Sequence, residues 1–415
     1  MDYKEALTWL YSLQRFGIKL GLENIRRLIA EYVASAPFRL GMGWKPGRCV
    51  IHVAGTNGKG SVCAMIDSIC RAQGYRTGLF TSPHLVTFRE RIRVNGEMMS
   101  EDAVAKGLTT IRNLVANWDP HPTLFEVVTA LALKHFSETD VEIVILETGL
   151  GGRLDATNAV ESNVSVITPI DFDHEKWLGK TISEIAAEKA GIIKAGVSVV
   201  SAAQRSEAEK VIRAHAAECS APLEFVTNPY EETPIALAGS HQKQNATLAI
   251  AALRAARIDI DSSSIAQGLG RIQWPARFQR WDKRTIIDGA HNPAAAHMLA
   301  ETWREVFGDQ RAVLVLAILS DKNLRSICEA LAPISEFVLL PKIRSERAAS
   351  PEELAEILSA ITPSLPHSIA SSVSEALDLA QAKSSPILIT GSLHFAGEVL
   401  AHLRGEPAAF EECAQ

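Results

Sequence analysis

The sequence predicts an α/β protein of two domains: a larger domain with a mostly parallel sheet, followed by a smaller, Rossmann-like α/β domain. Near-continuous Val and Ile runs alternate with helical patterns, which is typical of a parallel sheet covered on both faces. A glycine-rich turn stands between the first such run and a helix. At 415 residues, the chain is also longer than one hydrophobic core usually organises.

Hydrophobic periodicity justifies the elements of the first domain, residues 1–280, in chain order. Two short helices precede the first strand, which is the β-branched run 50–54 and leads through the glycine turn into a helix at 62–71. The strands that follow are predicted at 78–81, 141–146 and 164–168, and the helices at 104–115, 125–136, 182–193, 207–217 and 242–256.

The second domain, residues 281–415, begins after a turn at 274–277. Its alternating pattern indicates a smaller α/β unit, and the Pro/Ser-rich segment 362–368 is predicted to be a loop. The strands are predicted at 285–287, 312–319, 337–340 and 386–390, and the helices at 293–306, 324–331, 351–358 and 373–382.

The composition argues against several classes of protein. A net charge of −6 disfavours a large nucleic-acid-binding face, and no apolar run approaches the ~20 residues that span a bilayer. The first residues lack the order of a secretory signal, so we expect a cytoplasmic protein without nucleic-acid or membrane partners. The cysteines are scattered without zinc-ligand spacing, which indicates reduced thiols.

The glycine turn, residues 55–61, reads GTNGKGS. Backbone N–H groups in such a turn and the positive end of the following helix hold phosphate oxygens, and a lysine adds a mobile ammonium. The spacing departs from the common GxxxxGK(S/T) loop, because Val53 lies where its first glycine would be. A tight turn that merely uses glycines is the alternative. The lysine and the hydroxyl favour a P-loop mononucleotide-binding domain, in which ATP contacts Asn57, Gly58, Lys59, Gly60 and Ser61.

Further strings follow this loop in chain order. They are TSPHL at 81–85, FE at 125–126, ETGLGGRLDATN at 147–158, DH at 173–174, EKAGI at 188–192, HQ at 241–242 with Asn245, and DGAHNP at 288–293. Together with GTNGKGS they resemble the signatures of the folylpolyglutamate synthase and dihydrofolate synthase family, a branch of the Mur-ligase superfamily. Weaker echoes lie at 321–322 and 391–392.

The resemblance implies an ADP-forming amide-bond ligase that adds L-glutamate to dihydropteroate, to reduced folates, or to both. ATP is the expected co-substrate, since an acyl phosphate would turn a carboxylate oxygen into a leaving group that the glutamate amine displaces. The first domain is expected to hold ATP and the pterin, and the second to contribute to ATP and glutamate binding. The family also implies a monomer.

The resemblance further implies Mg²⁺, with two ions expected. Ser82 and Glu147 would hold one between the β- and γ-phosphates, and His174 would contribute to a second. Glu147 also directly follows the predicted strand 141–146, at the sheet edge where α/β folds collect ligands, and Mg²⁺ prefers oxygen ligands. The alternatives are a buried Glu147 paired with Arg153 and a surface or capping His174.

Three residues are expected to be catalytic: Lys59, Lys189 and His291. Lys189 resembles a lysine that is carbamylated in many family members, which would reverse its charge; the alternative is a solvated helix lysine or one beside Glu188. His291 resembles a contact across the interdomain cleft, near phosphate or the incoming glutamate. Its alternative is an N-capping loop histidine.

More ATP contacts are implied at Asn245 on the adenine side, at Arg277 on the phosphates and at Asp288 from the second domain. A guanidinium suits phosphate charge, and the alternative for Arg277 is a linker arginine paired with a surface acid.

The resemblance implies a pterin site at the segments 123–126 and 153–155, where Phe125 would stack on the pterin and Asp155 would form hydrogen bonds with it. Taken alone, Phe125 would be interpreted as a core residue. The loop 19–24 resembles a segment that approaches the folate substrate. The pterin residues are Thr123, Leu124, Phe125, Glu126, Arg153, Leu154 and Asp155.

Three other functions stay open at this point. They are a peptidoglycan-precursor ligase acting on a nucleotide-linked muramyl substrate, a P-loop kinase or ATPase without amide synthesis, and a nucleotide-binding scaffold without catalysis. The TSPHL and GLGGRLDATN strings argue against the first. The residues do not decide between the dihydrofolate and polyglutamate activities, because these differ in pocket details, and we expect both.

Overall fold

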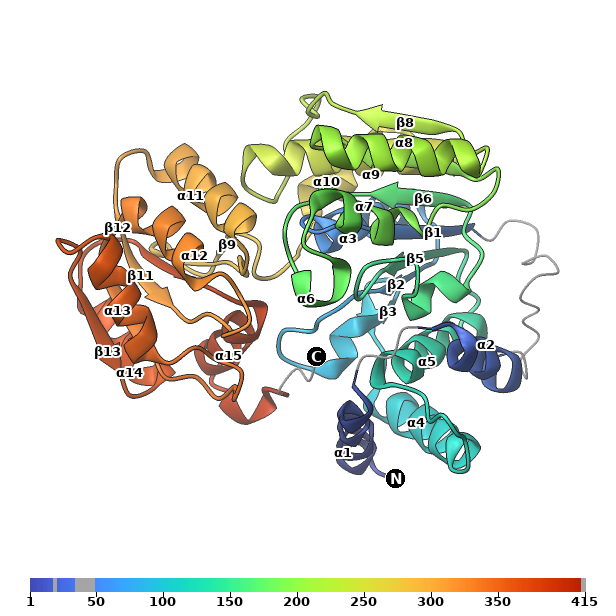
Figure 1. Cartoon of the computed structure of the whole chain (residues 1–415), viewed down its shortest axis with the longest axis horizontal. Coiled ribbons are helices and arrows are strands. Elements are labelled where there is room, and N and C mark those ends of the chain that lie inside the picture. The colour runs from blue at the N-terminus through green and yellow to red at the C-terminus, as the bar shows by residue number, and fades with distance from the viewer. Residues whose placement is uncertain (18–20, 34–48, 412–415) are drawn as a thin grey trace.

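The computed structural model describes residues 1–17, 21–33 and 49–411. In these ranges the chain forms two sheets flanked by helices (Figure 1). The larger has eight strands in the order β4-β3-β2-β5-β1-β6-β7-β8, and the smaller has six in the order β13-β12-β11-β14-β10-β9. Strand pairing is antiparallel at β2–β3–β4 and at β9–β10, and parallel elsewhere. The predicted α/β fold, with a mostly parallel sheet and a second, smaller α/β domain, is confirmed.

The larger sheet contains β1 (Cys49–Ala54), β2 (Thr77–Phe80), β3 (Ile92–Val94), β4 (Glu97–Met98), β5 (Ile143–Glu147), β6 (Val164–Ile167), β7 (Ser198–Ala202) and β8 (Leu223–Val226). Its helices are α1 (Tyr3–Ser12), α2 (Glu23–Leu28), α3 (Lys59–Gln73), α4 (Glu101–Val115), α5 (Leu124–Glu138), α6 (Glu175–Leu178), α7 (Ile182–Ala190), α8 (Ser206–Glu218), α9 (Ser240–Ala255) and α10 (Ser262–Arg271).

Helices cover both faces of this sheet. Every side chain of β1 is buried, and successive residues point to opposite faces. Val50 packs in a core with α4 and α5, whereas Ile51 and Val53 pack in another with α3 and α9. Because β5 and β6 pair in parallel with β1, the loops after these three strands meet at one edge of the sheet.

The smaller sheet contains β9 (Gln279–Arg280), β10 (Thr285–Ile287), β11 (Ala312–Leu316), β12 (Ser335–Pro341), β13 (His367–Ala370) and β14 (Ile387–Thr390). Its helices are α11 (Pro293–Phe307), α12 (Leu324–Leu331), α13 (Pro351–Ile361), α14 (Val373–Gln381) and α15 (Leu393–Leu403). The second sheet thus includes β9, two residues ahead of the boundary drawn between 280 and 281, and that boundary stays a prediction.

Several elements were not predicted. β3 and β4 are too short to show a period, and β8 is only partly buried, so its apolar run is weak. The predicted loop 362–368 is wrong at its end, because β13 begins at His367 and pairs with β12 along the sheet edge. Glu147 is the last residue of β5 rather than the residue after it.

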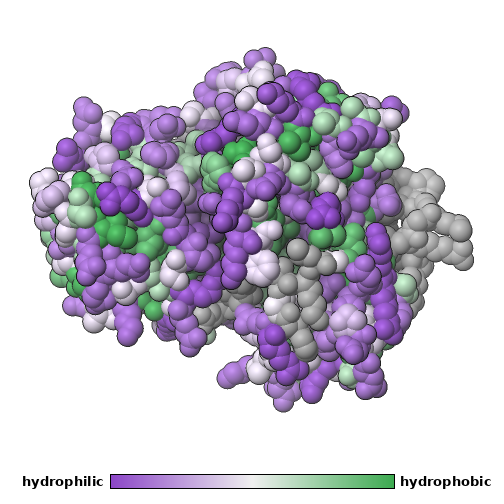
Figure 2. Space-filling view, in the orientation of Figure 1, coloured by the Kyte–Doolittle hydropathy of each residue, from purple (hydrophilic) through white to green (hydrophobic). Residues whose placement is uncertain are grey.

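Polar residues cover most of the face drawn in Figure 2, and its apolar residues lie in small, scattered groups. None of the helices in the described ranges combines the length and apolarity that a membrane span requires.

Candidate active site

The glycine turn joins β1 to α3 at the sheet edge. Gly58 has a φ of 89° and immediately precedes α3, so the helix begins inside the turn. The Lys59 ammonium folds back and donates to the carbonyl oxygens of Gly55 (3.1 Å) and Thr56 (3.2 Å). A glycine turn that opens a helix N-terminus is a built anion site, and the lysine lies within it.

Gly55 is required by close packing as well as by its backbone angle. Its φ is 148°, and a methyl group at this position would lie 1.8 Å from Thr168 Oγ1. We expect Gly55→Ala to lower the free energy of unfolding by about 3 kcal/mol, measured by urea denaturation. Gly74→Ala is the matched control, because Gly74 also has a positive φ (99°) but nothing within 4 Å of the added methyl. Equal losses of unfolding free energy in the two variants would show that the clash with Thr168 adds nothing to the cost of the positive φ.

Lys189 lies under the glycine turn. It is 4% exposed, and its ammonium donates to the Gly55 carbonyl (2.8 Å), the same oxygen that Lys59 contacts. Burial, together with the positive charge of Lys59 and against the opposing effect of Asp173, lowers the pKa of Lys189 to about 7. The alternative of a solvated lysine is therefore wrong, and a substantial share of this amine is neutral near pH 7.

Glu147 and Ser82 meet at the end of β5. The Ser82 N–H donates to Glu147 Oε2 (3.1 Å), and Glu147 is 5% exposed. Burial raises the pKa of Glu147, while the nearby positive charges of Lys59 and Arg277 lower it. Its predicted alternative pairing with Arg153 is wrong, because Arg153 donates instead to Glu188 (2.8 Å).

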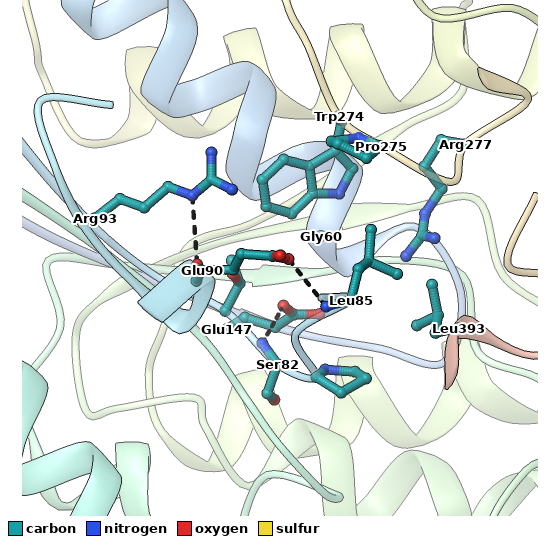
Figure 3. Close-up of a pocket in the computed structure, with 12 residues that line it drawn as sticks. Gly60, Ser82, Leu85, Glu90, Arg93, Glu147, Trp274, Pro275, Arg277 and Leu393 are labelled. Atoms are coloured by element: carbon teal, nitrogen blue, oxygen red, sulfur yellow. Dashed lines mark hydrogen bonds between the residues drawn. The ribbon is translucent and has the colours of Figure 1, made fainter. Parts of the chain in front are cut away.

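A cavity of about 30 Å³ lies over this pair. Figure 3 shows that residues far apart in the sequence surround it: Ser82 from the loop after β2, Glu147 from β5, Trp274 and Arg277 from the segment between the sheets, and Leu393 from α15. This volume admits a few water molecules or an ion. The cavity therefore suits the phosphate end of a nucleotide.

The donors at the cavity fit a divalent ion that is shared with phosphates. No three His, Cys, Asp or Glu side chains converge on a metal position in the described part of the chain. Mg²⁺ commonly uses only one or two protein groups and completes its shell with phosphate and water, so the Ser82 hydroxyl and the Glu147 carboxylate form a suitable set. His174 immediately precedes α6 and its side chain is 42% exposed, as the surface alternative expects. Partial desolvation and the nearby positive charges lower its pKa to about 4, so the imidazole is neutral at pH 7 and keeps a lone pair for a metal.

Asp173 connects the two domains and was not predicted as a site residue. Its Oδ1 accepts from Lys322 Nζ (2.6 Å), and its Oδ2 accepts from Asn292 Nδ2 (3.2 Å). His291 Nε2 lies 3.6 Å from the same oxygen. Burial by itself would raise the pKa of Asp173, but the nearby His291 imidazole and the surrounding positive charges hold it well below its usual range.

The DGAHNP loop reaches the glycine turn through Asn292. Asn292 Nδ2 donates to Asn57 Oδ1 (3.0 Å), and Asn292 Oδ1 accepts from the Ala295 N–H, so this residue caps α11. The alternative of an N-capping His291 is therefore wrong. His291 Nδ1 bonds to the Gly289 carbonyl (2.8 Å), and its other nitrogen faces Asp173.

The other predicted ATP contacts have assigned partners. A methyl group at Gly58 would lie 2.9 Å from Asn245 Oδ1, so Asn245 touches the glycine turn. Arg277 lines the cavity, and its guanidinium donates to the Ala276 carbonyl (2.9 Å). Both Asp288 oxygens accept from backbone N–H groups, of Phe278 just ahead of β9 and of Ala290, so Asp288 shapes the loop around Arg277. A direct contact of Asp288 with ATP stays a prediction.

The predicted pterin residues lie on both sides of the GLGG loop. Thr123 and Glu126 form a capping box at the start of α5, and Leu124 is buried there. A methyl group at Gly149 would lie 2.6 Å from the Phe125 ring, and the Asp155 carboxylate accepts from the Gly149 and Leu150 N–H groups (2.9 Å each).

Phe125 and Asp155 therefore shape one loop, which Leu154 and Arg153 follow in the chain. Their contact with a pterin stays a prediction. Of the predicted loop 19–24, residues 19 and 20 lie outside the described residues.

Comparison with known proteins covers nearly the whole chain. Residues 53–202 match the Mur ligase middle domain, and residues 270–393 match the Mur ligase, glutamate ligase domain. The dihydrofolate synthase/folylpolyglutamate synthase of Bacillus subtilis is 35% identical over 97% of this chain and 99% of its own length.

Two solved structures are similar over almost the full chain. Escherichia coli FolC in complex with DHPP and ADP has a TM-score of 0.85, is 32% identical, and is matched over 96% of this chain and 98% of its own. The bifunctional folylpolyglutamate synthase/dihydrofolate synthase of Yersinia pestis, complexed with AMPPNP and Mn ion, has a TM-score of 0.84 and 30% identity over 97% and 98%.

Proposed function

Because this chain belongs to the dihydrofolate synthase/folylpolyglutamate synthase family, within the Mur ligases, we propose that it adds L-glutamate both to dihydropteroate and to reduced folates. It is an ATP-dependent, ADP-forming ligase that uses a divalent metal. The observation that carries the proposal for the site is the meeting of the two domains at Asp173 and Asn57, next to the glycine turn. Two substrates held by different domains would be brought together there.

The glycine turn and the cavity are proposed to hold the triphosphate. Lys59 would leave its carbonyl partners for the β- and γ-phosphates, and Arg277 would face the γ-phosphate across the cavity. Ser82 and Glu147 would hold one Mg²⁺, and His174 would contribute to a second. When bound, such ions neutralise phosphate charge as it develops during transfer.

Lys189 is proposed to be carbamylated. Its neutral amine would add to CO₂, forming the N–C bond and releasing one proton, so that a cation becomes a carboxylate-like anion. A pKa of about 7 keeps enough neutral amine at cellular pH for this addition. The anion would lie beside the Lys59 ammonium and offset its charge under the glycine turn.

The chain's residues would serve the two chemical steps in turn. In the first, the substrate carboxylate attacks the γ-phosphorus and ADP leaves, with Lys59 and Arg277 placed to stabilise the transferred charge. In the second, the glutamate amine attacks the acyl carbon and phosphate leaves. His291 and Lys322, held by Asp173, are placed to position the phosphate or the incoming glutamate from the second domain.

The test is phosphate release by the purified protein with MgATP and glutamate, with dihydropteroate or a reduced folate added in parallel and each product identified by mass. We expect release to require glutamate together with either pterin. Release with dihydropteroate alone would restrict the enzyme to dihydrofolate synthesis, and release with folate alone to polyglutamylation. Release indifferent to both pterins would reject the ligase in favour of an ATPase. The expected monomer and cytoplasmic location stay predictions.

A further inference from the structure

The segment 82–88, which we call the Ser82 loop, joins β2 to the turn η3 (Phe88–Arg91) and lines the cavity. At one end, the Ser82 N–H donates to Glu147. At the other, the Glu90 carboxylate accepts from the N–H groups of residues 85, 86 and 87 at 2.9 to 3.1 Å, and Figure 3 shows the bond to Leu85. The path of this loop therefore determines where Ser82 and Glu147 meet.

The second domain packs onto the middle of the Ser82 loop. Leu85 and Val86 are buried in an apolar core with α14 and α15. A methyl group at Gly397, in α15, would lie 1.9 Å from the Leu85 carbonyl oxygen, so helix and loop are in direct backbone contact. A loop of the first sheet is thus part of the core of the second domain.

Glu411, the last residue that the structure describes, lies in the second domain and forms hydrogen bonds with the Ser82 loop. Its Oε2 accepts from the Phe88 N–H (2.5 Å) and the Thr87 hydroxyl (3.1 Å). The same oxygen accepts from the Tyr3 hydroxyl in α1 (3.2 Å). One carboxylate oxygen therefore joins the Ser82 loop to the first helix of the chain.

The backbone around Glu411 holds the same loop. Its N–H donates to the Val86 carbonyl (2.8 Å), and its carbonyl oxygen bonds to His84 Nε2 (3.0 Å). The preceding Phe410 is buried, with its ring edge-on to that of His394 in α15 (5.1 Å between centroids). Residues 410 and 411 are thus anchored in the second domain and bond to residues 84–88 of the first, near the C-terminal end of the chain in Figure 1.

We propose that Glu411 is a positioning residue for the ligase reaction: through the Ser82 loop it holds Ser82 and Glu147 where they bind the metal and the terminal phosphates. Hydrogen bonds from N–H and O–H groups to a carboxylate are about twice as strong as neutral ones, and site residues need support of this kind to stay within about half an ångström of their working positions. The inference rests on the proposed roles of Ser82 and Glu147.

The experiment compares Glu411→Ala, Glu411→Gln and Tyr3→Phe in the full chain. It measures kcat against Mg²⁺ concentration, and Mn²⁺ binding by electron paramagnetic resonance in the presence of a non-hydrolysable ATP analogue. We expect Glu411→Ala to raise the half-saturating Mg²⁺ concentration and the Mn²⁺ Kd about tenfold, with much of kcat recovered at high metal. Glu411→Gln keeps an acceptor oxygen and should shift both by less than about threefold. Tyr3→Phe removes the bond from α1 to the same oxygen and the contact with the Thr87 hydroxyl (3.4 Å) but leaves the bonds from Glu411 to the loop, so it should shift both by less than about twofold.

A lower Tm for Glu411→Ala with unchanged metal dependence would overturn the proposal and leave Glu411 a purely structural residue. If Glu411→Ala fails to fold, Thr87→Val removes one bond to the same carboxylate and should raise both constants about twofold to fivefold. Glu147→Gln separates this test from that of the proposed function. If Glu147→Gln weakens metal binding and Glu411→Ala does not, only the positioning role is rejected. If Glu147→Gln leaves metal binding unchanged, the assigned metal site is rejected.

Discussion

Replacing Lys189 with methionine is expected to lower kcat about a thousandfold and, at pH 6, to raise the free energy of unfolding by about 2–4 kcal/mol. Activity falls because the group proposed to become an anion is removed. Stability rises because the buried ammonium is costly: its folded pKa is about 7, below the usual lysine value of 10.5. Kinetics in the presence of bicarbonate measure the first effect, and urea denaturation in bicarbonate-free buffer measures the second.

The effect of Lys189→Met on the free energy of unfolding depends on pH. Below pH 7 both the folded and the unfolded lysine hold a proton, so the cost of the buried charge is fully present. Between pH 7 and 10.5 the unfolded state holds a proton that the folded state has lost, so wild-type stability from this group rises with pH. The stabilisation by Lys189→Met should therefore shrink as pH rises from 7 toward 10.5.

Lys194→Met is the matched control. Lys194 follows α7, the helix that contains Lys189, and its ammonium donates to the Asn158 carbonyl, away from the glycine turn. We expect its kcat to stay within about twofold of wild type. Wild-type enzyme stripped of CO₂ should also regain activity on addition of bicarbonate, and faster at pH 8 than at pH 6, because only the neutral amine reacts. An enzyme indifferent to bicarbonate would reject the carbamate.

Replacing Asp173 with asparagine is expected to lower kcat/KM for glutamate about a hundredfold. Asp173 and Lys322 are each 8% exposed at the side chain, so the change leaves a buried ammonium without its counter-ion. It also weakens the contacts that bring His291 and Asn292 of the second domain to the glycine turn. Steady-state kinetics with glutamate as the varied substrate measure the loss.

Asp171→Asn provides the comparison for Asp173→Asn. Asp171 is two residues away and forms an ion pair with Arg205 (3.0 Å) that is more exposed than the pair of Asp173 with Lys322. Its replacement should therefore lower kcat/KM for glutamate by less than about threefold. Lys322→Met completes a double-mutant cycle, in which we expect the double variant to be no worse than either single one. Additive losses would show that the two residues do not act as a pair.

The fold could be read from the sequence wherever an element carries its own pattern. β1 is buried on both faces and therefore appears as a run that is apolar at every position except His52, and α4 shows a clear apolar face. β3 and β4 were missed because two or three residues carry no period, and their pairing with β2 depends on partners elsewhere in the chain. β13 was partly misread as a loop because it is a short edge strand with mostly unburied residues.

The sequence by itself determined the family, the glycine turn and the position of Glu147 at a strand end, because each depends on consecutive residues and their backbone preferences. Only the tertiary structure decided which groups are charged, buried or paired. Lys189 reaches the Gly55 carbonyl over 134 residues, Lys322 reaches Asp173 over 149, and Glu411 reaches Phe88 over 323. Burial and nearby charge are properties of the surroundings in space, so the lowered pKa of Lys189, the domain contact at Asp173 and the anchoring of the Ser82 loop have no local pattern in the sequence.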